Sequence, residues 1–96
     1  MPRILAQAVH YPKPEHREDL IGAMKRLAAA TEGLAGLDEI GGFEDAEGGR
    51  IVAISVWASP EAMQAGMPVL GAAIADVPFD EWERRPGSMT FLPQVA

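Results

Sequence analysis

The sequence predicts an α+β fold, with two helices on one face of a four-stranded antiparallel sheet. Strand-like and helix-like segments follow one another in the order β-α-β-β-α-β. With right-handed crossovers, this order gives a ferredoxin-like sandwich. Two of the expected strands, residues 3–10 and 51–57, are apolar on both faces. Because the helices can cover only one face, we expect a second copy of the chain to cover the other.

The first strand spans residues 3–10 and ends at Pro12, because proline has no N–H to donate to a strand ladder. Pro14 suits the first turn of a helix, and acidic residues follow it near the positive end of the helix dipole. Apolar residues then recur at helical spacing, so we expect a helix over residues 14–32. Its buried stripe is expected to consist of Leu20, Met24, Leu27 and Thr31, flanked by Ile21 and Ala28.

The second and third strands form a hairpin. Residues 37–44 make the second strand, in which Gly41 and Gly42 predict a bulge or a sharp bend. Residues 47–49 close the turn. The third strand, residues 51–57, is rich in β-branched residues and ends at Trp57, which shares a face with Ser55.

The second helix begins at Ser59 and Pro60, which are a good N-cap and a good first helical residue. Pro68 lies inside this helix and removes a backbone donor, so we expect a kink or a break. Residues 79–87 have no clear pattern. Residues 88–95 alternate as a final strand, which Pro93 confines to the edge of the sheet.

The composition is that of a soluble globular protein with one domain, residues 1–96. The net charge of −6 argues against binding to nucleic acid or to an anionic membrane surface, since both need clustered basic residues. The absence of cysteine excludes disulfides and thiolate chemistry and fits a reducing compartment. No signal peptide or membrane span is expected, so we expect a cytoplasmic protein.

Three segments together resemble the antibiotic biosynthesis monooxygenase type of dimeric α+β barrel. They are residues 12–15 (PKPE), residues 34–37 (LAGL) and residues 56–62 (VWASPEA). The last is similar to the family's Trp-x-Ser-x-Glu-Ala pattern, where the third strand meets the second helix. The resemblance covers about residues 3–75 and implies a homodimer.

Members of this family include cofactor-independent oxygenases of polyphenol-like substrates and haem-degrading oxygenases. The resemblance implies that Trp57 lines a cavity between sheet and helices; the alternative is that the ring fills the core. Gln7 falls where such oxygenases carry a pocket asparagine. Its amide can donate and accept hydrogen bonds, but its longer side chain moves the amide; a polar residue near the barrel end is the simpler explanation.

The two histidines are the side chains whose ordinary pKa suits proton transfer near neutral pH. His10, with Tyr11 beside it, is the candidate base, whereas His16 fits a surface position in a first helical turn. Met63 and Met67 are expected to line the pocket or to fill the core. The second helix lacks the haem-ligating histidine of haem-degrading relatives, so we expect no haem, metal or other cofactor.

Two hypotheses of function remain close to each other. The first is a cofactor-free monooxygenase that acts on a small aromatic, phenol-like substrate, with Trp57, Gln7 and His10 as catalytic residues. Tyr11, Met63 and Met67 would contact the substrate. The second is a non-catalytic ligand-binding or structural homodimer with Trp57 in its core. Isomerase or dehalogenase-like chemistry, which is seen on similar barrels, is a third and weaker hypothesis.

Overall fold

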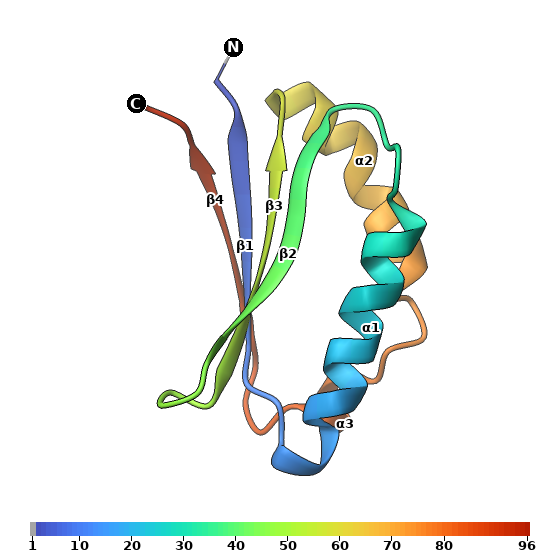
Figure 1. Ribbon diagram of the computed structural model, residues 1–96, viewed down its shortest axis with the longest axis vertical. Coiled ribbons are helices and arrows are strands. Elements are labelled where there is room, and N and C mark those ends of the chain that lie inside the picture. Colours follow the sequence, from blue (N-terminus) through green and yellow to red (C-terminus); the bar gives the residue numbers. More distant parts are fainter. Residues whose placement is uncertain (1) are drawn as a thin grey trace.

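The computed structural model describes residues 2–96 and has the predicted α+β architecture. The strands form one antiparallel sheet in the order β2-β3-β1-β4. Figure 1 shows the two long helices, α1 and α2, on the same face of this sheet, while the other face is open. The elements are β1 (Ile4–His10), the 3-10 turn η1 (Pro14–His16), α1 (Arg17–Ala30), β2 (Leu37–Asp45), β3 (Arg50–Trp57), α2 (Pro60–Ala73), α3 (Phe79–Trp82) and β4 (Ser88–Pro93).

The core lies between the helices and the covered face of the sheet. Ile4 pairs with Trp57 and Ala6 with Ser55, so these four residues share the covered face. Leu20 of α1 and Trp57 of β3 are the largest fully buried side chains. The stripe expected on the first helix is buried in part, since Leu20 and Thr31 are buried while Met24 and Leu27 are half-buried.

The opposite side of the sheet, here called the open face, carries side chains that alternate with those of the core. In the two central strands this face is almost wholly apolar, apart from Gln7 in the middle of β1. Phe43 of β2 is 60% exposed and Leu92 of β4 is 46% exposed. No other element of the described residues covers this face (Figure 1). The apolar side chains of the open face are Leu5, Val9, Phe43, Val52, Ile54, Val56 and Leu92.

The prediction of a bulge at Gly41 and Gly42 was wrong. Both glycines pair regularly with β3, and the irregularity lies earlier in β2, between Leu37 and Glu39. Gly42 serves a different purpose, because a Cβ there would overlap the end of the Met24 side chain on α1. The missing side chain therefore leaves room for the end of the Met24 side chain between helix and sheet.

The second helix follows the prediction at its start but not in its interior. The Ser59 hydroxyl accepts a hydrogen bond from the Ala62 N–H at 3.1 Å, as a capping residue does. Of the kink or break expected at Pro68, the break does not occur, because α2 continues through this residue to Ala73. Pro68 is exposed on this helix, while Gly66 is buried beneath it against the sheet.

Residues 79–87, which the sequence pattern left without assignment, form the connection between α2 and β4. We call them the α3–β4 segment; they contain α3 and a turn that runs beside the end of β1. The Lys13 N–H donates to the Trp82 carbonyl at 2.7 Å, and the Arg84 N–H donates to the Tyr11 carbonyl at 2.9 Å. These bonds join the segment to residues about seventy positions earlier in the chain, which explains why local pattern did not reveal it.

Candidate functional site

Trp57 ends β3 on the covered face and is fully buried, with 0% of its surface exposed. Its Nε1–H donates to the Ser55 hydroxyl at 2.9 Å. The ring packs against Gly66 of α2, where a Cβ would lie 2.5 Å from the ring atom Cη2. This surrounding is that of a core residue, and Trp57 lines neither of the two grooves described below.

Gln7 lies on the other side of the sheet. It pairs with Ile54, whereas Trp57 pairs with Ile4, three positions away along β1. Since side chains alternate along a strand, Gln7 belongs to the open face and Trp57 to the covered face. The structure therefore does not bring together the two residues that the resemblance assigned to one pocket, and the role of each in catalysis stays a prediction.

His10 and Tyr11 come together with a residue that the sequence did not single out, Glu83 of the α3–β4 segment. The His10 Nδ1 lies 3.4 Å from Glu83 Oε2, and the Tyr11 N–H donates to Glu83 Oε1 at 2.9 Å. The Glu83 side chain is 7% exposed and that of His10 is 18% exposed. The His10 ring also stacks on the Phe79 ring, with centroids 5.4 Å apart. A half-buried imidazole is thus held by a carboxylate and an aromatic ring.

The Tyr11 side chain lies among arginines. The Arg85 guanidinium covers the ring, with Cζ 3.7 Å from the ring centroid, and Arg84 lies farther off at 5.5 Å. The pKa of Tyr11 is lowered, chiefly by the interaction of the Arg85 guanidinium with the phenol oxygen and then by the positive charges of Arg85 and Arg50. This end of the sheet therefore favours negative charge on an aromatic oxygen.

A groove of about 420 Å³ runs along the α3–β4 segment. It combines an aromatic ring, two arginines and the carboxylate that holds His10. Two of its lining residues, Phe79 and Glu83, contact the His10 ring directly. The groove is lined by Phe79, Asp80, Glu83, Arg84, Arg85, Pro86 and Gly87.

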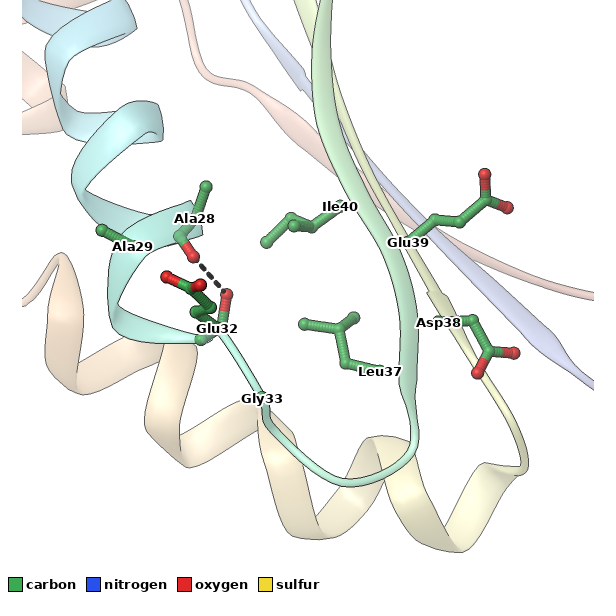
Figure 2. Close-up of a pocket in the computed structure, with 9 residues that line it drawn as sticks. Ala28, Ala29, Glu32, Gly33, Leu37, Asp38, Glu39 and Ile40 are labelled. Atoms are coloured by element: carbon green, nitrogen blue, oxygen red, sulfur yellow. Dashed lines mark hydrogen bonds between the residues drawn. The ribbon is translucent and has the colours of Figure 1, made fainter.

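A second groove, of about 430 Å³, lies between the end of α1 and the edge strand β2. Figure 2 shows Leu37 and Ile40 pointing from β2 toward α1, while Asp38 and Glu39 point away from the helix. Ala28 and Ala29 complete an apolar surface. No histidine lines this groove, whose titratable residues are Glu32, Asp38 and Glu39.

The remaining predicted contacts with substrate do not meet at either groove. Met63 and Met67 are half-buried on α2 and line neither of them. Within residues 2–96, no three His, Asp or Glu side chains are grouped so that they could hold a metal ion. In the same residues, every helix is too short or too polar to cross a bilayer.

Sequence reasoning missed Phe79, Glu83 and Arg85 because it left residues 79–87 without assignment. One local signal was present: an aromatic residue, a carboxylate and two arginines occur together in residues 82–85 (WERR). Such a run is more often a solvated surface, and only the tertiary contact with His10 and Tyr11 distinguishes it.

Comparison with solved structures identifies the architecture. The structure of Rv0793 from Mycobacterium tuberculosis is 23% identical, with a TM-score of 0.81 over 98% of this chain and 96% of that one. PA3566 from Pseudomonas aeruginosa is 15% identical, with a TM-score of 0.80 over 100% and 97%. An antibiotic biosynthesis monooxygenase is 17% identical, with a TM-score of 0.77 over 97% and 99%.

The chain has the fold of the antibiotic biosynthesis monooxygenases. This confirms the resemblance inferred from the three sequence segments at the level of the fold. Neither a protein-family model nor a curated protein matches the sequence. At these identities the comparison establishes the monooxygenase-type fold.

Proposed function

We propose that this protein is a homodimeric oxygenase that acts on a small phenol-like substrate without a metal or organic cofactor. The observation that carries the proposal is the pair of His10 and Glu83 beside the groove of the α3–β4 segment. The shared fold of the antibiotic biosynthesis monooxygenases supports it. The groove thus replaces the Trp57 cavity as the candidate site.

His10 would act as the general base. When the Nδ1–H of His10 donates a hydrogen bond to the Glu83 carboxylate, the lone pair of the ring lies on Nε2, where it can take a proton from the substrate. Glu83 would also stabilise the imidazolium that results. The fixed ring geometry, set by Phe79 on one face, gives the base a defined direction.

The reaction needs no external reductant. Removal of a proton from an activated ring CH₂, or from its phenol tautomer, leaves an electron-rich carbon that forms a C–O bond with O₂. The resulting hydroperoxide loses water, so one oxygen atom remains as a carbonyl and the other leaves as water. The two C–H bonds supply the four electrons. Positive charge from Arg85 near the groove would stabilise the substrate anion.

The homodimer is part of the proposal and rests on the open face. Monomeric proteins seldom expose a contiguous apolar surface of this kind. A second copy packed on the same face would bury Ile54 and Phe43 in a two-fold interface between sheets. The resemblance to dimeric α+β barrels implies that such packing would close a barrel.

A second candidate, a non-catalytic ligand-binding or structural homodimer, is favoured by one specific observation. Trp57, the residue that the resemblance placed in a cavity, is sealed against Gly66 and hydrogen-bonded to Ser55. Both grooves lie elsewhere on the chain. This candidate keeps the same assembly and assigns no chemistry to His10.

An oxygen electrode separates the two candidates. A panel of anthrones, naphthols and quinols should include at least one compound that makes the wild type consume O₂, with one oxygen atom recovered in product when ¹⁸O₂ is used. His10→Gln should lower that rate by about 10²-fold or more, the usual contribution of a general base. His16→Gln, which changes the other histidine, should leave it unchanged. A wild-type protein that consumes no O₂ with any compound would favour the non-catalytic dimer.

A further inference from the structure

Arg85 stands out among the arginines of this acidic chain. The sequence holds 14 acidic residues; Arg3, Arg26 and Arg50 each form an ion pair with one of them, and Arg17 forms ion pairs with two. Arg84 donates instead to the Gly48 and Gly49 carbonyls of the hairpin turn. No ion pair in the described part of the chain includes Arg85.

The geometry of Arg85 leaves it able to bind an anion. Its guanidinium lies over the Tyr11 ring, with Cζ 3.7 Å from the centroid. A guanidinium has five N–H donors, so the donors of Arg85 that do not interact with the Tyr11 phenol oxygen remain to bind the two oxygens of a carboxylate. The aromatic support also holds the side chain in place, so less conformational entropy is lost when a ligand binds.

The same groove also contains an aromatic side chain, Phe79, against which the ring of a ligand could pack. Phe79 lines the groove with Arg85, and one face of its ring is already stacked on His10. We infer that the groove along residues 79–87 binds aromatic acids, with the carboxylate on the Arg85 guanidinium and the ring against Phe79. The inference names the substrate class of the proposed oxygenase and rests on that proposal for its biological meaning, but binding itself requires no turnover.

Two acidic residues also line the groove, and their negative charge opposes the binding of an anion. The Glu83 carboxylate is occupied by the Tyr11 N–H and by His10, so its charge is partly compensated. Asp80 is exposed, lines the groove and forms no ion pair within residues 2–96. Its charge would weaken the binding of an anion, so Asp80→Asn should tighten the binding of an aromatic acid.

The test is an NMR titration of the ¹⁵N-labelled full chain with benzoate and with benzamide, its neutral analogue. Benzoate should shift the amide signals of residues 79–87 saturably, and benzamide should bind at least about tenfold more weakly. Arg85→Gln should reduce the affinity for benzoate to that for benzamide. Arg26→Gln removes an arginine of α1 that is paired with Asp76 and should leave benzoate binding unchanged.

Three results would overturn the inference: equal binding of benzoate and benzamide, unchanged benzoate binding in Arg85→Gln, or shifts that are scattered and do not saturate. The inference and the proposed function fail separately. If benzoate binds through Arg85 but no phenol consumes O₂, the oxygenase proposal falls and the anion site stands. If turnover occurs but neither acidic substrates nor Arg85→Gln affect it, the anion site falls and the oxygenase stands.

Discussion

The contact between Gly66 and Trp57 shows how a single glycine holds the second helix close to the sheet. The indole ring lies where a side chain on Gly66 would begin, and the ring has no exposed surface. The hydrogen bond from Nε1 to Ser55 satisfies the polar end of the ring inside the core. Close packing of this kind is sensitive to one added methyl group.

We expect Gly66→Ala to destabilise the protein by about 1–3 kcal/mol, because the new Cβ overlaps the Trp57 ring. Gly71→Ala on the same helix is the matched control, since nothing lies within 4 Å of its added Cβ. That control should be neutral or stabilising, because alanine favours a helix. Urea denaturation of both variants measures the difference.

The pair Gly66→Ala with Trp57→Phe tests the assigned contact further. Phenylalanine is smaller than tryptophan, so the double variant should be more stable than the sum of the two single effects predicts. Strictly additive effects would mean that the two residues do not compete for the same space.

Tyr11 offers a second prediction at this scale, and it is the only tyrosine in the chain. Its pKa should lie below the ordinary value of 10.0, because of Arg85 first and Arg50 in addition. Between the lowered pKa and 10.0 the unfolded state binds more protons, so this group stabilises the fold increasingly as pH rises through that window. Titration of the phenolate absorbance should show the shift, and Arg85→Gln should reduce it. An unchanged phenolate titration in Arg85→Gln would refute the assigned cause.

Among the elements, the α3–β4 segment depends most on a single side chain. Glu83 accepts from the Tyr11 N–H and contacts His10, and Gly87 leaves room for the Val9 carbonyl beside it. An isolated bridge between Pro12 and Glu83 adds to the connection. The carboxylate therefore fastens the segment to the end of β1.

We expect Glu83→Ala to destabilise the protein by about 1–3 kcal/mol, because it leaves the half-buried Tyr11 N–H without its acceptor. Glu83→Gln keeps an acceptor oxygen and should cost less. Glu81→Ala, an exposed change on α3, should have little effect. Hydrogen exchange of residues 79–87 should accelerate in Glu83→Ala alone; equal exchange in all three variants would contradict the fastening role.

The elements that the sequence predicted best are those with strong local patterns. The ends of β1, β3 and α1 agree with the predicted ranges to within about three residues, because alternation, capping and proline positions act locally. The bulge was misplaced because Gly42 makes room for the Met24 side chain of α1, a contact between elements that local sequence does not reveal. The α3–β4 segment was missed because its hydrogen bonds reach Tyr11 and Lys13 across the whole sequence.

The candidate site likewise combines residues that the sequence could identify with one that it could not. His10 and Tyr11 could be named from the sequence, since few of its side chains titrate near neutral pH. Their partner Glu83 could not, because the contact forms only in the folded chain. Alternation assigned Gln7 and Trp57 each to a face of its own strand, but only the pairing of β1 with β3 in the folded chain shows that these faces lie on opposite sides of the sheet.

At the scale of the whole molecule, the main feature is a sheet that is covered by helices on one face only. Helices cover one face of the sheet and leave the apolar open face without cover (Figure 1). We propose that a second copy of the chain covers this face and that the two form a homodimer. Ile54, in the middle of β3, lies at the centre of the expected interface.

Sedimentation at low micromolar concentration tests this claim most directly. The wild type should sediment at about twice the chain mass of 10.3 kDa. Ile54→Asp should give monomer or unfolded chain, because it places an unpaired charge in the interface. Val69→Asp changes an exposed apolar residue on α2, away from the open face, and should remain a dimer. A well-folded wild-type monomer, or a normal dimer of Ile54→Asp, would contradict the account.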